Sequence, residues 1–238
     1  MTLLECEGLD TYYGDSQVLH DTSLSIGPGE HIGVIGRNGM GKSTLVYTIM
    51  GIVRARRGRV VFNGKDLTGA APEKVAAAGI TLVPQGRRVF GSLSVGENLR
   101  VSHIDRGSDG WTVDQVCDRL PILRDRWSQP ARQMSGGQQQ MLALGRALVG
   151  NGDLVLMDEP SEGLDQHHLA LVVDVVHELR RRGTAVLVVE QKLRFALDMV
   201  DQLNVMVRGQ FVQTISTEQA RTNPSVLMEG LGFGSAAV

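Results

Sequence analysis

The stretch Gly36-Arg37-Asn38-Gly39-Met40-Gly41-Lys42-Ser43-Thr44 decides the fold of this 238-residue chain. It fits the pattern G-x-x-x-x-G-K-[ST], in which glycines let the backbone turn with positive φ and approach an anion closely. A β-branched run at 31–35 precedes it, and a helix-like segment from Lys42 to Met50 follows. Successive N–H groups and the positive end of a helix meet in such a loop, so we predict a phosphate-binding strand–loop–helix unit.

The chemistry of phosphate assigns a role to each position of this loop. The Lys42 ammonium would hold the β- and γ-phosphates of a nucleotide, and the Ser43 hydroxyl would coordinate Mg²⁺. Thr44 would reach a further phosphate oxygen. The backbone around the phosphates would come from Gly36, Asn38, Gly39 and Gly41.

An acidic pair follows a second apolar strand. The continuously apolar run Leu154–Met157 leads into Asp158-Glu159-Pro160. Carboxylates at the C-terminal end of a parallel strand face the crevice in which ligands bind. Asp158 is therefore expected to hold Mg²⁺ through water, and Glu159 is the candidate that orients or deprotonates an attacking water.

The remaining patterns predict one α/β domain. Continuously apolar strands separated by helical stretches favour a mostly parallel sheet covered on both faces. Residues 92–150 contain more helical material and predict a helical subdomain inserted between the core segments 1–91 and 151–238. The Gly-, Ala- and Ser-rich end at 230–238 is expected to fray. Strands are predicted at 3–9, 18–26, 154–157, 185–189, 202–207 and 210–214, and helices at 113–120 and 138–148.

The charge balance argues against nucleic-acid binding through an overall positive electrostatic field. Lys and Arg number 24 and Asp and Glu number 26, a net charge of −2. The arginine runs at 54–57 and 180–182 are interpreted as solvated faces. Cys6 and Cys117 fit reduced thiols better than a disulfide or zinc framework. Neither a membrane-spanning run nor a secretory signal is recognisable, so a cytoplasmic protein is expected.

A third motif, Met134-Ser135-Gly136-Gly137-Gln138, precedes a predicted helix at 139–149. Ser135 stands where a helix N-cap would, and Gly136 and Gly137 allow close backbone approach. With Gln138 they form a second candidate phosphate-binding helix start. Alone, the motif would indicate only a loop.

The order of the motifs resembles that of the ATP-binding subunit of an ABC transporter, over nearly the whole chain. That order is the phosphate loop, Gln85, Ser-Gly-Gly-Gln, Asp158-Glu159 and Asp165. The resemblance implies a P-loop NTPase core with an N-terminal antiparallel β-subdomain, and ATP and Mg²⁺ as ligands. It also implies that Tyr13 stacks on adenine and that Gln85 approaches both Mg²⁺ and the attacking water.

The same resemblance implies a dimer. In the family, each nucleotide site combines the phosphate loop of one chain with the Ser-Gly-Gly-Gln motif of the other. Asp165 matches a loop that links the two subunits. This chain has one copy of each motif, so it would have to pair with itself or with a paralogue.

One position departs from the family pattern. Many members carry a histidine that contacts the γ-phosphate after the strand that here ends at Val189, and Gln191 takes its place. Glutamine donates a hydrogen bond but cannot become a cation. Gln191 therefore joins Gln85 and Glu159 as a candidate catalytic residue, with Glu159 the principal one. The nearby His167-His168 pair is interpreted as solvent-facing.

Further motifs are similar to those of the hydrophobic amino-acid uptake branch. The segments at 84–90, 93–99 and 189–191 look like the smaller ATP-binding subunit of branched-chain amino-acid importers. Urea and short-chain amide importers share nearly the same motifs, and Pro84-Gln85-Gly86 leans slightly toward them. We therefore predict a branched-chain or hydrophobic amino-acid importer, with a urea or short-chain amide importer as the alternative. This subunit does not contact the solute, so the substrate rests on analogy.

As such a subunit, the chain would act at the cytoplasmic face of the inner or plasma membrane. Its partners would be permease subunits, a second ATP-binding subunit and, indirectly, a solute-binding protein. Arg87-Arg88 would face the permease or form a solvated basic turn. One alternative is a non-transport ABC ATPase that acts on nucleic acid or ribosomes, but the chain lacks the paired domains and basic arms typical of those. Another is an inactive ATP-binding partner, against which intact Lys42, Asp158 and Glu159 argue.

Overall fold

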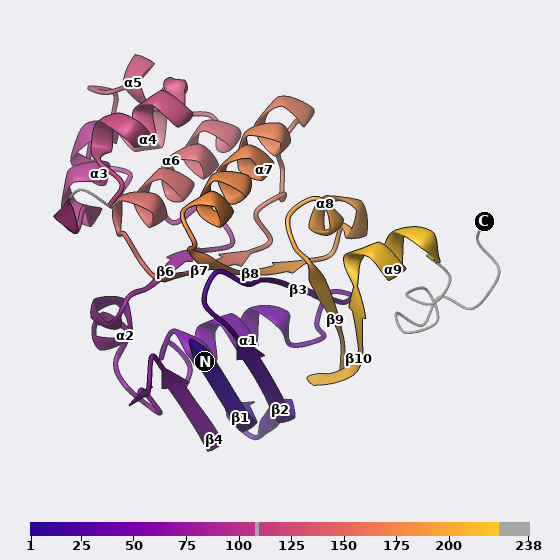
Figure 1. The fold of residues 1–238 in the computed structure, drawn as a ribbon. Coiled ribbons are helices and arrows are strands. Elements are labelled where there is room, and N and C mark those ends of the chain that lie inside the picture. Colours follow the sequence, from indigo (N-terminus) through magenta and orange to yellow (C-terminus); the bar gives the residue numbers. More distant parts are fainter. Residues whose placement is uncertain (108–109, 224–238) are drawn as a thin grey trace.

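Two β-sheets carry the fold in the described part of the computed structural model, residues 1–107 and 110–223 (Figure 1). The smaller sheet has the order β2-β1-β4-β5 and its pairings are antiparallel. Its strands are β1 Leu4–Tyr13, β2 Ser16–Ile26, β4 Ala55–Phe62 and β5 Lys65–Asp66. The tail expected to fray, 230–238, lies outside the described residues.

The larger sheet has the order β10-β9-β3-β8-β7-β6. Its pairings are parallel from β9 to β6, and β10 alone among these strands runs antiparallel to its neighbour. The predicted α/β class, with a mostly parallel sheet and an N-terminal antiparallel β-subdomain, is therefore confirmed. The strands are β3 His31–Ile35, β6 Ile80–Val83, β7 Leu154–Asp158, β8 Ala185–Glu190, β9 Gln202–Val207 and β10 Gln210–Ser216.

The larger sheet is buried on both faces, as its continuous apolar strands predict. In β8, Val186 and Val188 join a cluster formed mainly with the helices on one face. Leu187 and Val189 join the cluster on the other face, which includes helix α1 and the smaller sheet. Successive side chains of a strand point to opposite faces, so such a strand needs apolar residues at every position. Helix α1 spans Lys42–Ile49.

The described residues of the segment 92–150 form helices joined by loops, and the proposed boundaries of that subdomain stay a prediction. Helix α6 begins three residues earlier than the sequence predicts, although Gly136 and Gly137 are poor helix formers. Ser135 and Gln138 form a reciprocal capping box that satisfies backbone N–H groups of the first turn. The elements are α3 Val95–Ser102, α4 Val113–Arg119, α5 Pro121–Asp125, the 3₁₀ helix Ala131–Gln133 and α6 Gly136–Val149.

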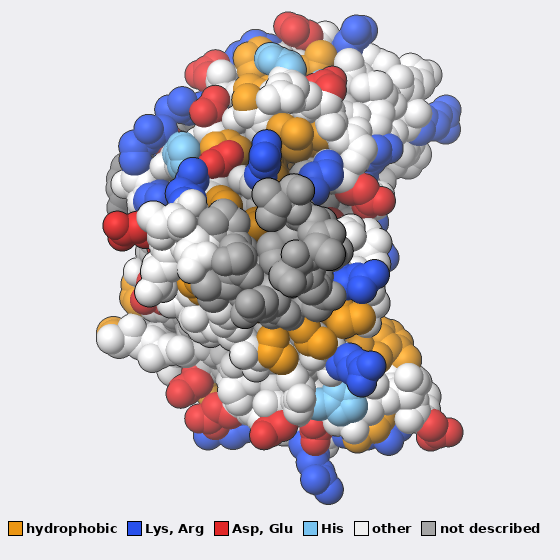
Figure 2. Space-filling view, turned by 90° about the vertical axis from the view of Figure 1, so that its right-hand side faces the viewer, with side chains coloured by type: hydrophobic (Ala, Val, Ile, Leu, Met, Phe, Trp, Pro, Cys, Tyr) orange, Lys and Arg blue, Asp and Glu red, His pale blue; other side chains and the backbone are white. Residues whose placement is uncertain are grey.

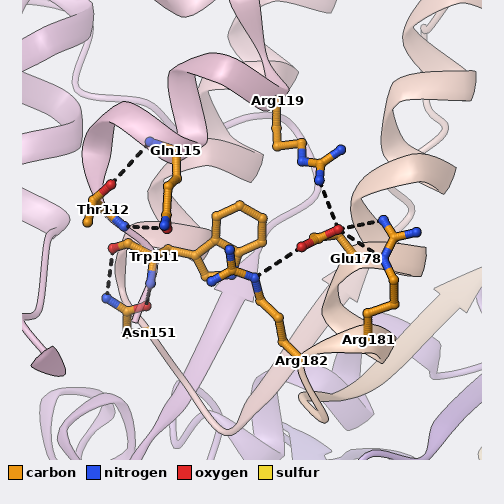
Figure 3. A network of polar contacts seen from close by, with 8 residues as sticks. All are labelled: Trp111, Thr112, Gln115, Arg119, Asn151, Glu178, Arg181 and Arg182. Carbon is orange, nitrogen blue, oxygen red and sulfur yellow. Dashed lines mark hydrogen bonds and ion pairs between the residues drawn. The ribbon is translucent and has the colours of Figure 1, made fainter. Parts of the chain in front are cut away.

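A polar network ties this helical region to helix α7, Gln166–Arg181 (Figure 3). The buried Trp111 lies under the Arg182 guanidinium, whose Cζ is 3.8 Å from the centre of the ring. Glu178 of α7 forms ion pairs with Arg119, Arg181 and Arg182. The arginines at 180–182 are exposed, as predicted, and they also form ion pairs. The sequence did not reveal that Arg182 packs on Trp111.

The outer surface mixes charges of both signs. On the face in Figure 2, lysines and arginines alternate with acidic side chains, and hydrophobic side chains form small patches between them. No helix within residues 1–107 and 110–223 is both long and apolar enough to cross a membrane. The remaining helices are α2 Pro72–Ala78, α8 Leu193–Leu197 and α9 Thr217–Thr222.

Candidate nucleotide site

The predicted phosphate loop joins the carboxyl end of β3 to the start of α1. Gly39 and Gly41 have φ values of 78° and 99°, in the left-handed region that favours glycine. Gly36 is required for a different reason, because a Cβ there would lie 2.5 Å from the Met206 carbonyl oxygen of β9. Close packing against a neighbouring strand therefore fixes the first glycine.

Residues from distant parts of the sequence surround one pocket of about 520 Å³. It lies at the carboxyl ends of the central parallel strands, where ligands bind in open α/β sheets. Tyr13, Gly36, Asp158, Ser135–Gln138 and Asp165 are not part of its lining. The lining consists of Val18, Asn38, Gly39, Gly41, Lys42, Ser43, Thr44, Gln85, Glu159, Glu162 and Gln191.

The carboxylate of Glu159 is held between two predicted site residues. Its Oε1 lies 3.2 Å from Lys42 Nζ, and its Oε2 accepts a hydrogen bond of 3.2 Å from Gln85 Nε2. The Lys42 ammonium also donates to the carbonyl oxygens of Gly36 and Arg37. Glu159 has a φ of 48°, a left-handed conformation that is uncommon for a residue with a side chain. Such a conformation persists only where its surroundings impose it.

Asp158 is not part of the pocket lining and is fully buried. Its Oδ1 accepts a hydrogen bond of 2.8 Å from the Ser43 hydroxyl, whereas its Oδ2 has no hydrogen-bond partner among the described residues. Burial raises the pKa of this carboxyl, and the hydroxyl groups of Ser43 and Tyr47 oppose that shift. An unpaired carboxylate oxygen beside a hydroxyl, both hard oxygen donors, is a donor set that suits Mg²⁺.

The protein alone offers few ligands for a cation. Within residues 1–107 and 110–223, no group of three or more His, Cys, Asp or Glu side chains could hold a metal ion. A cation at Asp158 and Ser43 would therefore need further oxygens from a phosphate and from water. Mg²⁺ commonly binds in this way, with few protein ligands.

Glu190 is a site residue that sequence reasoning missed. It is 1% exposed, and its Oε2 accepts hydrogen bonds from the backbone N–H groups of Gln191 and Lys192. Its Oε1 accepts from the N–H of Ser161, which follows the acidic pair. One buried carboxylate thus orders the turns after both β7 and β8. A charged residue directly after the apolar run 185–189 is the signal that could have revealed it.

The Ser-Gly-Gly-Gln motif lies away from this pocket, against two other side chains. Arg87 packs so closely on Gly136 that a Cβ there would lie 2.4 Å from its Nη1. The His168 ring lies against Gly137 in the same way, at 3.1 Å. The prediction that His168 faces solvent was wrong, since 18% of its side chain is exposed and its Nδ1 lies 2.8 Å from Asp165 Oδ1. His167 is exposed, as predicted.

Asp165 serves as the N-cap of α7 and accepts a hydrogen bond from the His168 N–H. This bond holds the pKa of the Asp165 carboxyl below its ordinary value. Tyr13 stands at the end of β1 and is 50% exposed, next to the turn at Gly14. An open aromatic face is compatible with base stacking, and that role stays a prediction.

A family model described as ABC transporter matches residues 19–162, which include the phosphate loop, the Ser-Gly-Gly-Gln motif and the acidic pair. The chain belongs to the ABC transporter family. The pocket around Lys42 is our candidate for the ATP site of this ABC ATPase.

Individual relatives of this ABC ATPase match over nearly their whole length. The chain is 39% identical to the high-affinity branched-chain amino acid transport ATP-binding protein BraG of Pseudomonas aeruginosa, over 97% of this chain and 100% of BraG. It is 32% identical to a probable branched-chain amino acid transport ATP-binding protein, LivF, of Archaeoglobus fulgidus, over 87% of this chain and 89% of LivF. A nucleotide-free ATP-binding cassette from an ABC transporter superposes with a TM-score of 0.82 at 28% identity, covering 95% of this chain and 98% of that one.

Proposed function

We propose that the chain is the ATP-hydrolysing subunit of an importer for branched-chain or other hydrophobic amino acids. The full-length likeness to BraG supports this substrate class. The likeness to LivF supports it too. The solute would not contact this chain. The proposed substrate class therefore rests on the relatives and on the motifs at 84–99 and 189–191. The alternatives of a urea or amide importer, or of an ATPase acting on nucleic acid, have no comparable support.

The arrangement around Glu159 carries the proposal of hydrolysis. Lys42 neutralises this carboxylate across 3.2 Å. Incoming β- and γ-phosphates compete for the same ammonium, because Lys42 is the buried cation of the phosphate loop. The carboxylate released from Lys42 stays hydrogen-bonded to Gln85 and can orient a water and accept its proton. Gln191, in the same lining, can donate a hydrogen bond to the terminal phosphate.

Asp158 and Ser43 fit a Mg²⁺ ion that arrives with ATP, on the evidence of the unpaired Oδ2 and the neighbouring hydroxyl. A bound Mg²⁺ would neutralise charge on the phosphate oxygens during transfer. Ser43 would turn its oxygen toward the ion, and the charge of the ion would offset the desolvation that raises the pKa of Asp158. Gln85 is the third proposed ligand, through its amide oxygen or through water.

The motif residues outside the pocket fit a role toward a second subunit. Ser135–Gln138 and Asp165 are absent from the lining around Lys42. Asp165 and the backbone at Ser135 lie at the N-terminal ends of α7 and α6, which attract anions. We propose that they complete the nucleotide site of a partner subunit, identical or homologous, as the family resemblance implies.

A groove beside the Gln85 loop is our candidate for the permease contact. It measures about 250 Å³ and is lined by side chains from both the core and the helical region, including Arg88, Ser102 and Arg146. Four of the exposed large hydrophobic residues lie on the segments around it: Ile52, Phe90, Val101 and Ile104. Exposed apolar side chains gathered around a groove mark a protein contact. Such a contact would keep the subunit at the cytoplasmic face of the membrane.

Substitution of Glu159 tests the proposed chemistry. Glu159→Gln should retain ATP affinity but lose at least about 100-fold in the hydrolysis rate, since the amide cannot accept the proton. Glu162→Gln is the matched control, because Glu162 lines the same pocket and makes none of the Glu159 contacts. Phosphate release and fluorescent-nucleotide titration give the two readouts. An unchanged hydrolysis rate in Glu159→Gln contradicts the role of Glu159.

Uptake of labelled solutes tests the substrate class. A strain that lacks this gene should take up labelled leucine more slowly than its parent and recover with the wild-type gene but not with Glu159→Gln. Labelled urea is the comparison solute. A defect confined to urea would replace the amino-acid proposal and leave the ATPase proposal standing.

A further inference from the structure

Arg146 joins three parts of the protein through one side chain. It stands on α6, ten residues after Gly136, which is about 15 Å along a helix. Its Nε donates to Ser102 Oγ of α3 at 3.0 Å, and its Nη1 donates to the Arg88 carbonyl oxygen at 3.0 Å. Its guanidinium also covers the ring of Phe90, with Cζ 4.2 Å from the ring centre.

The charge of Arg146 has no acidic partner within the described residues. Burial lowers the pKa of its guanidinium, and no carboxylate offsets that shift. A half-buried cation without a counter-charge is costly, so an apolar side chain would suit this packing site better if packing were its only task. An arginine offers two features that an apolar side chain lacks, a planar face and a rigid set of N–H donors. The face covers the Phe90 ring while the donors bind the Arg88 carbonyl and the Ser102 hydroxyl.

The segment that Arg146 holds is conformationally unusual. Arg87 and Arg88 have φ values of 70° and 35°, in the left-handed region. Two consecutive left-handed residues with side chains require support from their surroundings. The bond from Arg146 to the Arg88 carbonyl supplies such support, and the segment begins at Gln85, whose amide holds Glu159.

The other end of α6 contacts the same segment. The Arg87 guanidinium lies against Gly136, the first residue of α6. The segment 85–90 is thus held at the beginning of α6 by Arg87 and near its end by Arg146. Helix α6 is buried along much of its length, so we expect it to connect these two contacts rigidly.

We propose that Arg146 is a positioning residue that fixes the segment 85–90 to α6, so that displacement of Phe90 moves Gln85 and the Ser135–Gln138 motif together. The inference rests on the proposed function and deepens it. A permease element in the groove lined by Arg88, Ser102 and Arg146 would press on this junction. The junction would then convey that displacement to the carboxylate of Glu159 and to the surface that meets the partner subunit.

The kinetic test uses Arg146→Lys in the full-length chain with Mg-ATP. Lysine keeps the charge but lacks the planar fork, so it cannot make the three contacts together. We expect kcat to fall about tenfold while KM for ATP stays within about twofold, because the phosphate loop is untouched. Arg100→Lys is the matched control, since Arg100 of α3 covers Trp127 with Cζ 5.2 Å from the ring and, among the described residues, has no hydrogen bond or ion pair with segment 85–90. It should leave kcat unchanged.

A second variant separates positioning from simple stabilisation. Phe90→Leu removes the aromatic face, and its effect on kcat should not add to that of Arg146→Lys, because both break one junction. Additive effects, or an equal loss of ATP affinity and kcat with lowered thermal stability, would overturn the proposal.

Hydrogen exchange gives a readout that does not need activity. In Arg146→Lys, amides at 84–92 and at 134–140 should both exchange faster, while the phosphate loop at 36–44 should not change. Faster exchange at 84–92 alone would overturn the coupling. If both segments respond but the wild-type chain hydrolyses no ATP, the proposed function fails and the junction stands.

Discussion

Replacement of Asn98 by alanine should destabilise the protein strongly, because this buried side chain ties together the chain after the Gln85 loop. Asn98 is 0% exposed. Its Oδ1 accepts from the Phe90 N–H at 3.0 Å, and its Nδ2 donates to the carbonyl oxygens of Phe90, Leu93 and Ser94 at 3.0, 3.3 and 2.9 Å. The alanine variant loses all four bonds.

The loss in free energy of unfolding depends on which groups keep a hydrogen-bond partner in the alanine variant. The three carbonyl oxygens keep other partners: Phe90 accepts from the Leu93 N–H, Leu93 from Ala131 and Ser94 from the Asn98 N–H. The Phe90 N–H is the group that loses its partner. At about 1 kcal/mol for each of the three shorter bonds, the free energy of unfolding should fall by ~3 kcal/mol. For a chain of this size that corresponds to a drop in melting temperature of roughly 6–12 °C.

Urea and thermal unfolding followed by circular dichroism would measure this loss. Gln129→Ala is the matched control, because Gln129 donates one exposed hydrogen bond, to the Gln133 carbonyl, in the same helical region. It should change stability by less than about 0.5 kcal/mol. A loss below about 1 kcal/mol in Asn98→Ala would refute the reasoning, since it would mean that water replaces the four bonds at almost no cost.

Three further predictions concern other parts of the molecule. Lys42→Ala should weaken ATP binding by at least about 30-fold in a fluorescent-nucleotide titration, because a charge-assisted bond contributes ~2 kcal/mol; unchanged affinity would exclude the proposed role of Lys42. Burial lowers the pKa of His31, so the unfolded chain binds the proton more readily and stability should fall as pH drops through about 6.5. His31→Gln should flatten this dependence in thermal melts at pH 5.5 and 7.5, and an identical slope would contradict it. Burial raises the pKa of Cys6 to about 12 and also raises the pKa of the buried Cys117. A thiol reagent at pH 8 should therefore label the native chain hardly at all, and should label both thiols in denaturant. Rapid labelling of the native chain would contradict this prediction and show that the thiols are accessible.

The strands and the phosphate loop were predictable because their signals are local. Continuous apolar runs identified β7 and β8 to within one residue, since a strand buried on both faces must be apolar throughout. The turns of the phosphate loop need positive φ at Gly39 and Gly41, which glycine marks in the sequence. Strand β4 was missed because its first residues include the arginine run at 54–57, whose charges are tolerated where the strand is exposed.

Contacts between distant residues were not predictable from local patterns. The sequence placed Glu159 and Gln85 in one site only through the family resemblance, and the bond between them depends on how β6 and β7 pair. Glu190 was overlooked because its role is to bind backbone N–H groups of two turns, which no periodicity reveals. The same holds for Arg87, which resembled a surface cation in the sequence and instead packs on Gly136.

The chain's two tryptophans stand at informative places. Trp111 belongs to the helical region, but the cation over its ring is Arg182, which follows α7 of the core. Trp127 belongs to the same region and is covered by Arg100 from within it. The fluorescence emission of an indole ring responds to a nearby charge. Rotation of the helical region against the core would therefore change the emission of Trp111 and leave that of Trp127 unchanged. The intrinsic fluorescence of Trp111 can therefore report this rotation, with that of Trp127 as the reference. Substitution of either tryptophan by phenylalanine would separate the two signals without an added dye.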